Sequence, residues 1–253
     1  MHGWITPHKT RQRGPKTTTR NTEAESLPAI QSSALEIELA PRHAPRKRYP
    51  EAMKKLHRDD LFGWTEFDCE RNLDFHSVLW VRSAGNVAID PLPLSEHDAA
   101  HLEELGGLAT IVVTNKDHLR AGAELARRFE AKLLAPAGER EDFPAECDGW
   151  LSEGDEPVPG LRAMALDGSK TAGELCLILE GTTLITGDLI RSHVGGKLCT
   201  LPDPKLKDKT AAMESVRRVC ALEGIETVLT GDGWPIFRHG GEALLDLGEA
   251  LSR

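Results

Sequence analysis

The stretch of residues 111–118, Ile-Val-Val-Thr-Asn-Lys-Asp-His, constrains the fold of this chain more than any other part of the sequence. Its three β-branched apolar residues predict a short buried strand that ends where the polar residues begin. Residues 119–129 then carry apolar side chains at helical spacing, and Asp117 stands where the N-cap of that helix is expected. A strand that runs directly into a helix presents its last side chains at one rim of a sheet. Because α/β proteins usually bind ligands at such rims, we expect the functional site here.

Short apolar runs on both sides of this stretch predict further strands, and helices separate several of them. The expected strands cover residues 77–81, 86–90, 131–135, 161–166, 174–179, 182–186 and 227–230. The expected helices cover residues 97–105, 119–129, 210–222 and 242–251. Residues 144–160 and 189–204 mix glycine, proline and polar residues, so we expect loops there. Strands therefore come first and then alternate with helices, which predicts an α/β fold.

The first 52 residues differ in composition from the rest of the chain. They contain six prolines, nine lysines and arginines and five acidic residues, a net charge of +4. Their lack of apolar periodicity predicts a disordered basic tail ahead of a domain at residues 53–253. The glutamates argue against a transit peptide, and the absence of a continuous apolar stretch argues against a secretory signal peptide. As an alternative, Met53 is the true start, since ordered-looking sequence begins directly after it.

The charge and the cysteines of the remaining chain argue against several classes of protein. Of the total net charge of −9, residues 53–253 carry −13, so this part offers no basic surface for nucleic acid. No apolar run reaches the roughly 20 residues needed to cross a bilayer, so we expect no membrane span. The five cysteines are widely spaced and form no Cys-x-x-Cys pair, which indicates reduced thiols and a cytoplasmic protein. We expect a small-molecule ligand as partner, and the sequence assigns no oligomeric state.

Charged side chains follow four of the predicted strands. Asp117 and His118 follow the first of these strands, and Lys170, Asp188 and Asp232 follow the other three. If the strands lie side by side, these side chains converge at one rim. Carboxylate oxygen suits Mn, Fe or Zn, and imidazole nitrogen suits Zn or Fe. Three carboxylates and one imidazole therefore suggest a shell for one divalent metal ion.

The order of these pieces over residues 77–251 resembles the metallo-β-lactamase fold superfamily. The matching stretches are Asn-Val-Ala-Ile-Asp at 86–90, Val-Thr-Asn-Lys-Asp-His at 113–118, Thr-Ala-Gly-Glu at 171–174, Leu-Ile-Thr-Gly-Asp at 184–188 and Leu-Thr-Gly-Asp-Gly at 229–233. The resemblance implies an αββα four-layer sandwich with a metal site at one edge. The family signature is His-x-His-x-Asp-His, then an isolated histidine before a strand, then Gly-Asp and a last histidine.

Several ligands of that signature are replaced in this chain. Its first two histidines fall on Val113 and Asn115, and the isolated histidine falls on Lys170. Those three histidines bind the first metal in the family, so the resemblance implies that this first site is lost. The ligands of the second metal correspond to Asp117, His118, Asp188 and Asp232. The resemblance therefore implies one divalent ion (Zn, Fe or Mn) or none.

Two functions follow from this divergence. In the first, the domain is a single-metal hydrolase whose metal activates water, with Lys170 and Asp188 as catalytic residues and Lys170 stabilising the developing negative charge. In the second, a non-catalytic family member binds a small ligand or a protein at the same rim. A purely structural arrangement is the alternative to the metal shell: Asp117 caps a helix, Lys170 pairs with Asp188, and His118 packs on the rim. The fold alone does not choose between the two functions.

Overall fold

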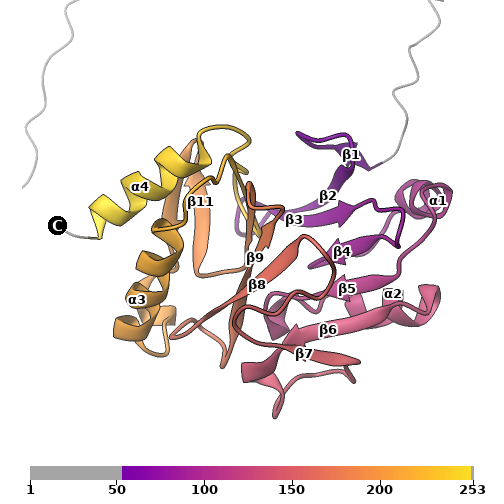
Figure 1. Ribbon diagram of the computed structural model, residues 1–253, viewed down its shortest axis with the longest axis horizontal. Coiled ribbons are helices and arrows are strands. Elements are labelled where there is room, and N and C mark those ends of the chain that lie inside the picture. The colour runs from indigo at the N-terminus through magenta and orange to yellow at the C-terminus, as the bar shows by residue number, and fades with distance from the viewer. Residues whose placement is uncertain (1–52, 252–253) are drawn as a thin grey trace, which may run out of the picture. The chain divides into compact units, whose positions relative to one another are not determined.

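The protein is built of four layers in the order helices, sheet, sheet and helices (Figure 1). The computed structural model describes residues 53–251, and the tail predicted for residues 1–52 lies outside them. The architecture is the αββα sandwich that the family resemblance implies. None of the helices within residues 53–251 is long and apolar enough to cross a membrane.

The larger sheet contains seven strands that lie in chain order. They are β1 (Lys54–Lys55), β2 (Leu61–Asp68), β3 (Leu73–Trp80), β4 (Val87–Ile89), β5 (Thr110–Val112), β6 (Lys132–Pro136) and β7 (Gly149–Leu151). Strands β1 to β4 are antiparallel, whereas β4 to β7 are parallel. Parallel neighbours need crossover connections. Two of these are helices, α1 (Glu96–Glu104) before β5 and α2 (Gly122–Phe129) before β6.

The smaller sheet contains four strands and packs against the other two helices. Its strands are β8 (Leu161–Leu166), β9 (Glu174–Leu179), β10 (Thr183–Thr186) and β13 (Thr227–Thr230). Their order is β13-β10-β9-β8, and only the pair β10 and β13 is parallel. Thr186 lies beside Thr230 in this pair, so the residues that follow both strands emerge at the same level. The helices are α3 (Lys209–Cys220) and α4 (Gly240–Ala250).

Three apolar clusters separate the four layers. Leu79, Ile111 and Leu125 belong to the cluster between the larger sheet and its helices. Leu61, Val112 and Leu177 belong to the cluster between the two sheets. Leu184, Val216 and Leu244 belong to the cluster between the smaller sheet and helices α3 and α4. Because successive residues of a strand face opposite sides, a strand with apolar residues on both sides must be covered twice, as β5 is.

Two segments that the sequence predicts as loops contain strands. Residues 189–204 form a hairpin of β11 (Ile190–Val194) and β12 (Lys197–Thr200), and the prediction of a surface loop is wrong there. Residues 144–160 contain β7, the edge strand of the larger sheet. Ile190, Arg191 and Ser192 of the hairpin are buried. Tertiary packing against α4 and β13, rather than local periodicity, stabilises this hairpin.

Candidate functional site

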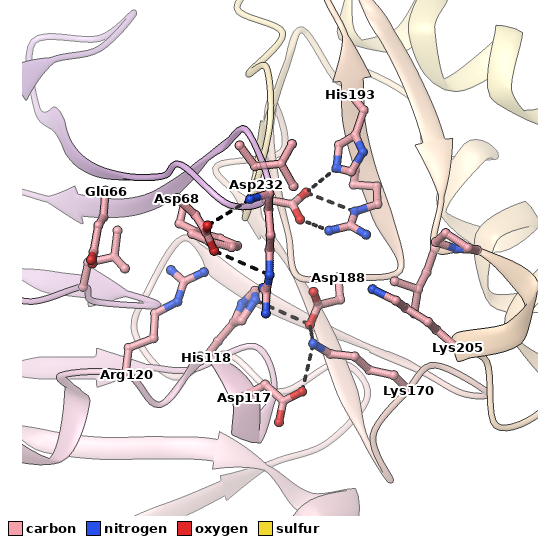
Figure 2. Close-up of a pocket in the computed structure, with 17 residues that line it drawn as sticks. Glu66, Asp68, Asp117, His118, Arg120, Lys170, Asp188, His193, Lys205 and Asp232 are labelled. Carbon is pink, nitrogen blue, oxygen red and sulfur yellow. Dashed lines mark hydrogen bonds and ion pairs between the residues drawn. The ribbon is translucent and has the colours of Figure 1, made fainter.

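The site lies where strands of both sheets end. A pocket of about 860 Å³ opens there, and Asp117, His118, Lys170, Asp188 and Asp232 all line it (Figure 2). The five side chains that the sequence places at strand ends therefore share one pocket. Each is held by its own partners, and two separate clusters result. We call these the Asp188 corner (Asp188, Lys170, Asp117, His118 and Asn115) and the Asp232 corner (Asp232, Arg191 and His193).

The ammonium of Lys170 bridges two carboxylates in the Asp188 corner. Its Nζ lies 2.8 Å from Asp117 Oδ2 and 2.8 Å from Asp188 Oδ2. Asn115 Nδ2 donates to the same Asp188 oxygen at 3.0 Å. Burial alone would raise the pKa of Asp188, but His118 and Lys170 outweigh it and hold that pKa well below its usual range. The pairing of Lys170 with Asp188 is thus confirmed, and both groups are ionised at neutral pH.

Asp117 does not cap the helix, contrary to the prediction. Helix α2 begins after Ala121 without a side-chain cap, and Asn115 instead caps a short 3-10 turn by accepting a hydrogen bond from the backbone N–H of Asp117 at 3.0 Å. This turn, Lys116–His118, precedes helix α2. The side chain of Asn115 accepts this hydrogen bond from the backbone N–H two residues later in the chain, which is the arrangement of an Asx turn. The carboxylate of Asp117 is therefore available to Lys170.

His118 is buried between two carboxylates and does not merely pack on the rim. Its Nδ1 lies 2.8 Å from Asp90 Oδ2, and its Nε2 lies 3.5 Å from Asp188 Oδ2. Thr114 donates its backbone N–H to Asp90 Oδ1 at 2.7 Å and its hydroxyl to Asp90 Oδ2 at 2.7 Å. Burial opposes a charged ring, but the two carboxylates outweigh it and raise the pKa of His118 to about 9. A Cβ at Gly231 would lie 2.8 Å from the ring, so only glycine fits there.

Glu174 is a buried acid below the pocket that the sequence analysis did not single out. It accepts hydrogen bonds from the hydroxyl of Ser169 and from the backbone N–H of Leu189. Burial and the nearby Asp188 carboxylate raise the pKa of Glu174 to about 7. The Thr-x-Gly-Glu stretch at the start of β9 was visible in the sequence, but an acid in an apolar strand gives no signal of its partner.

Asp232 belongs to a different cluster. Arg191 contacts both of its oxygens, with Nε 3.1 Å from Oδ1 and Nη2 against Oδ2, and His193 Nε2 lies 3.3 Å from Oδ1. Both partners come from β11, in the segment predicted as a loop. Burial and the cations Arg191 and Lys205 lower the pKa of His193, so its ring is neutral at pH 7. Arg191 was missed because nothing in its local sequence indicates burial.

The acidic side chains at this site do not fit a divalent metal ion as they lie. A metal ligand must present a free lone pair to the ion, and Asp117 and Asp188 each direct one oxygen, Oδ2, at Lys170. Asp232 is covered by the guanidinium of Arg191. Within residues 53–251, no group of three or more histidine, cysteine, aspartate or glutamate side chains is placed to hold a metal. The metal shell of Asp117, His118, Asp188 and Asp232 stays a prediction.

Two cations in the pocket wall have no carboxylate partner of their own. Lys205 and Arg120 project into the cavity from opposite sides (Figure 2). Within the described residues, neither forms an ion pair. Arg120 is largely buried and donates its Nη1 to the carbonyl oxygens of His76 (2.8 Å) and Asp90 (3.0 Å). Among the acids that line the pocket, Glu66 alone forms no ion pair within residues 53–251, so the unpaired cations outnumber the unpaired acids.

Comparison with known proteins gives a family and a fold. A family model described as metallo-beta-lactamase superfamily matches residues 53–251. A metallo beta lactamase from Erythrobacter litoralis superposes with a TM-score of 0.62 at 18% identity, covering 78% of this chain and 96% of that one. A metallo-beta-lactamase from Pontibacter korlensis superposes with a TM-score of 0.59 at 15% identity, covering 77% of this chain and 98% of that one. A metallo beta lactamase from Hirschia baltica superposes with a TM-score of 0.58 at 14% identity, covering 79% of this chain and 97% of that one. No curated protein matches the chain.

Proposed function

The chain belongs to the metallo-β-lactamase superfamily, and on that basis we propose that it is a non-catalytic member that binds a small organic anion at the pocket without a metal ion. One observation carries the proposal: the ammonium of Lys170 lies 2.8 Å from the carboxylates of both Asp117 and Asp188. A bound cation would have to displace this ammonium from a partly buried position. Because Lys170 already supplies positive charge, the carboxylates need no metal to be stable together.

The charge left in the pocket favours an anion over a cation. The ammonium of Lys205 is exposed and faces the cavity, whereas the guanidinium of Arg120 is held by backbone carbonyls. A carboxylate or phosphate group in the cavity would form a charge-assisted hydrogen bond with Lys205 and would be attracted by the charge of Arg120. The remaining lining includes the apolar residues Leu73, Phe75 and Leu201, which would contact the organic part of such a ligand.

Calorimetric titration at low ionic strength tests this binding with two defined probes, inorganic phosphate and succinate. We expect saturable binding of at least one of them, weakened about tenfold in Lys205→Ala, because one charge-assisted hydrogen bond is lost. Lys207→Ala is the matched control, since Lys207 is also exposed but does not line the pocket, and should bind as the unchanged chain does. Absence of binding, or equal weakening in both variants, would contradict the proposal.

The single-metal hydrolase is the competing function, and metal analysis separates the two. We expect protein purified without chelator to carry substoichiometric Zn, Fe or Mn. Near-stoichiometric metal that is lost in both Asp117→Ala and Asp188→Ala would favour the hydrolase and overturn the metal-free proposal. A Lys170→Ala variant sharpens the test, because removal of the ammonium frees both carboxylates. That variant should gain affinity for Zn²⁺ if Lys170 is what excludes the ion.

The setting of the protein belongs to the same proposal. All five cysteines are free thiols, as expected of a protein in a reducing compartment, and we propose the cytoplasm. The net charge of −13 on residues 53–253 supports a small ligand rather than nucleic acid as the partner.

A further inference from the structure

A second cavity opens on the other face of strand β3. It has a volume of about 390 Å³, within the range of small-molecule sites, which is roughly 300–1,000 Å³. Leu73 and Phe75 of β3 line the first pocket, whereas Asp74, His76 and Val78 line the second. Alternate residues of a strand face opposite sides, so the two cavities are separate sites. The first contains the charged corners, and none of those residues lines the second.

The wall of this second cavity is apolar and aromatic. Leu56, Val78 and Leu229 belong to the apolar layer between the two sheets, which reaches the surface here. The mouth is formed by Trp234 and Phe237, which are 63% and 37% exposed. Large apolar side chains that are exposed next to a cavity mark a binding surface more often than isolated ones do. The aromatic rings provide flat surfaces against which another ring can stack.

The polar groups of this cavity are neutral except at its exposed edge. Burial lowers the pKa of His76, so the ring is neutral at pH 7, and its Nε2 lies 2.6 Å from the carbonyl oxygen of Gly233. That nitrogen must donate to the carbonyl, which leaves Nδ1 as an acceptor. The charged residues that line the cavity, Lys54 and Asp74, are both exposed.

From these features we propose that the second cavity binds an uncharged molecule with an aromatic ring and one hydroxyl-sized polar group. The ring packs against Trp234 and Phe237, and the polar group donates a hydrogen bond to Nδ1 of His76. An ionised ligand is disfavoured, because no buried charge in the wall would compensate for the loss of its hydration. This site does not depend on the anion site, since it shares no lining residue with it.

Two matched probes test the proposal, 1-naphthol and naphthalene, which differ by one hydroxyl. Equilibrium dialysis of the full chain should show one saturable site that prefers 1-naphthol. Trp234→Ala should weaken both probes about tenfold, because the stacking surface is lost. Thr65→Trp places a large side chain at an exposed lining position and should block both probes. His76→Phe should reduce the preference for 1-naphthol by about fivefold without affecting naphthalene, because the ring stays and the acceptor nitrogen is lost.

Two controls keep the outcome specific. Leu245→Ala removes an exposed apolar side chain that lines neither cavity, and Lys205→Ala changes only the first pocket. Both should bind the probes as the unchanged chain does. No saturable binding, or binding that survives both Trp234→Ala and Thr65→Trp, overturns the proposal. Sedimentation of the same samples tests another occupant: a dimer that dissociates in Trp234→Ala would assign the aromatic mouth to contact between two copies instead.

Discussion

The two corners of the pocket begin from the same local sequence and end in different chemistry. Thr-Gly-Asp occurs at residues 186–188 and again at residues 230–232, after two strands that are parallel neighbours in register. Asp188 is held by Lys170 and by Asn115 and His118, which come from two separate stretches of the chain. Asp232 is held by Arg191 and His193, both from one hairpin.

The difference lies in how permanent the positive charge is. The guanidinium of Arg191 forms a bidentate contact with both oxygens of Asp232. An arginine side chain stays protonated at any pH the protein encounters. The Asp188 corner relies on a single ammonium shared by two carboxylates and on an imidazolium. The Asp232 corner is therefore a structural ion pair, whereas the Asp188 corner has a titratable part and is partly open to solvent.

The largest effect is expected from Arg191→Met, which leaves Asp232 buried without its ion-pair partner. Removal of one member of a buried pair costs about 4 kcal/mol, so the free energy of unfolding should fall by roughly that amount. Urea denaturation followed by circular dichroism measures it. The double variant Arg191→Met/Asp232→Leu should recover most of the loss, because the uncompensated charge is gone. If the double variant is no more stable than the single one, Arg191 acts through packing and the comparison fails.

Lys170→Met should cost less, about 3 kcal/mol, because its side chain is 27% exposed and His118 still neutralises Asp188. The same denaturation experiment measures this loss. Lys207→Met, at an exposed lysine outside the pocket, should be neutral and serves as the control. A loss larger than that of Arg191→Met would reverse the order of the two corners.

The pH dependence separates the corners next. The folded-state pKa of His118, about 9, lies above its unfolded value of 6.5. Its contribution to stability is therefore complete below about pH 6.5 and disappears as the pH rises through about 9. We expect unfolding free energy to fall by about 2 kcal/mol between these values, since the neighbouring carboxylates share the effect. In His118→Gln this alkaline loss should be much smaller, whereas Arg191→Met should retain it.

The smallest effect should come from Asn115→Ala. This change removes the hydrogen bond to Asp188 and the cap on the backbone N–H of Asp117, which together are worth about 1 kcal/mol or slightly more. Thermal unfolding should show a reduction of a few degrees. Asn115→Asp separates the two contributions, because it retains the cap acceptor but places a like charge beside Asp188. An Asp variant as stable as the natural chain would mean that the contact with Asp188 contributes nothing.

Much of the architecture could be predicted from local pattern. Strands β8, β9 and β13 have the predicted bounds, and the ends of the four helices lie within three residues of the predicted ends. Apolar runs that end at polar residues also located Asp117, His118, Lys170, Asp188 and Asp232 at one rim, because the ends of neighbouring strands must meet there. These features depend on the spacing of apolar and polar side chains within a short stretch of chain, and that spacing can be seen directly in the sequence.

The partner of each acid could not be predicted in the same way. Asp188 and Asp232 follow identical Thr-Gly dipeptides, yet one meets an ammonium and the other a guanidinium. Arg191 is buried because its hairpin packs against helix α4 and strand β13. Its local sequence carries no sign of that packing, so the segment was predicted to be a loop. The strength of an ion pair depends on the distance between the two charges in space. Arg191 and Asp232 are 41 positions apart in the chain and come close only after the layers have packed.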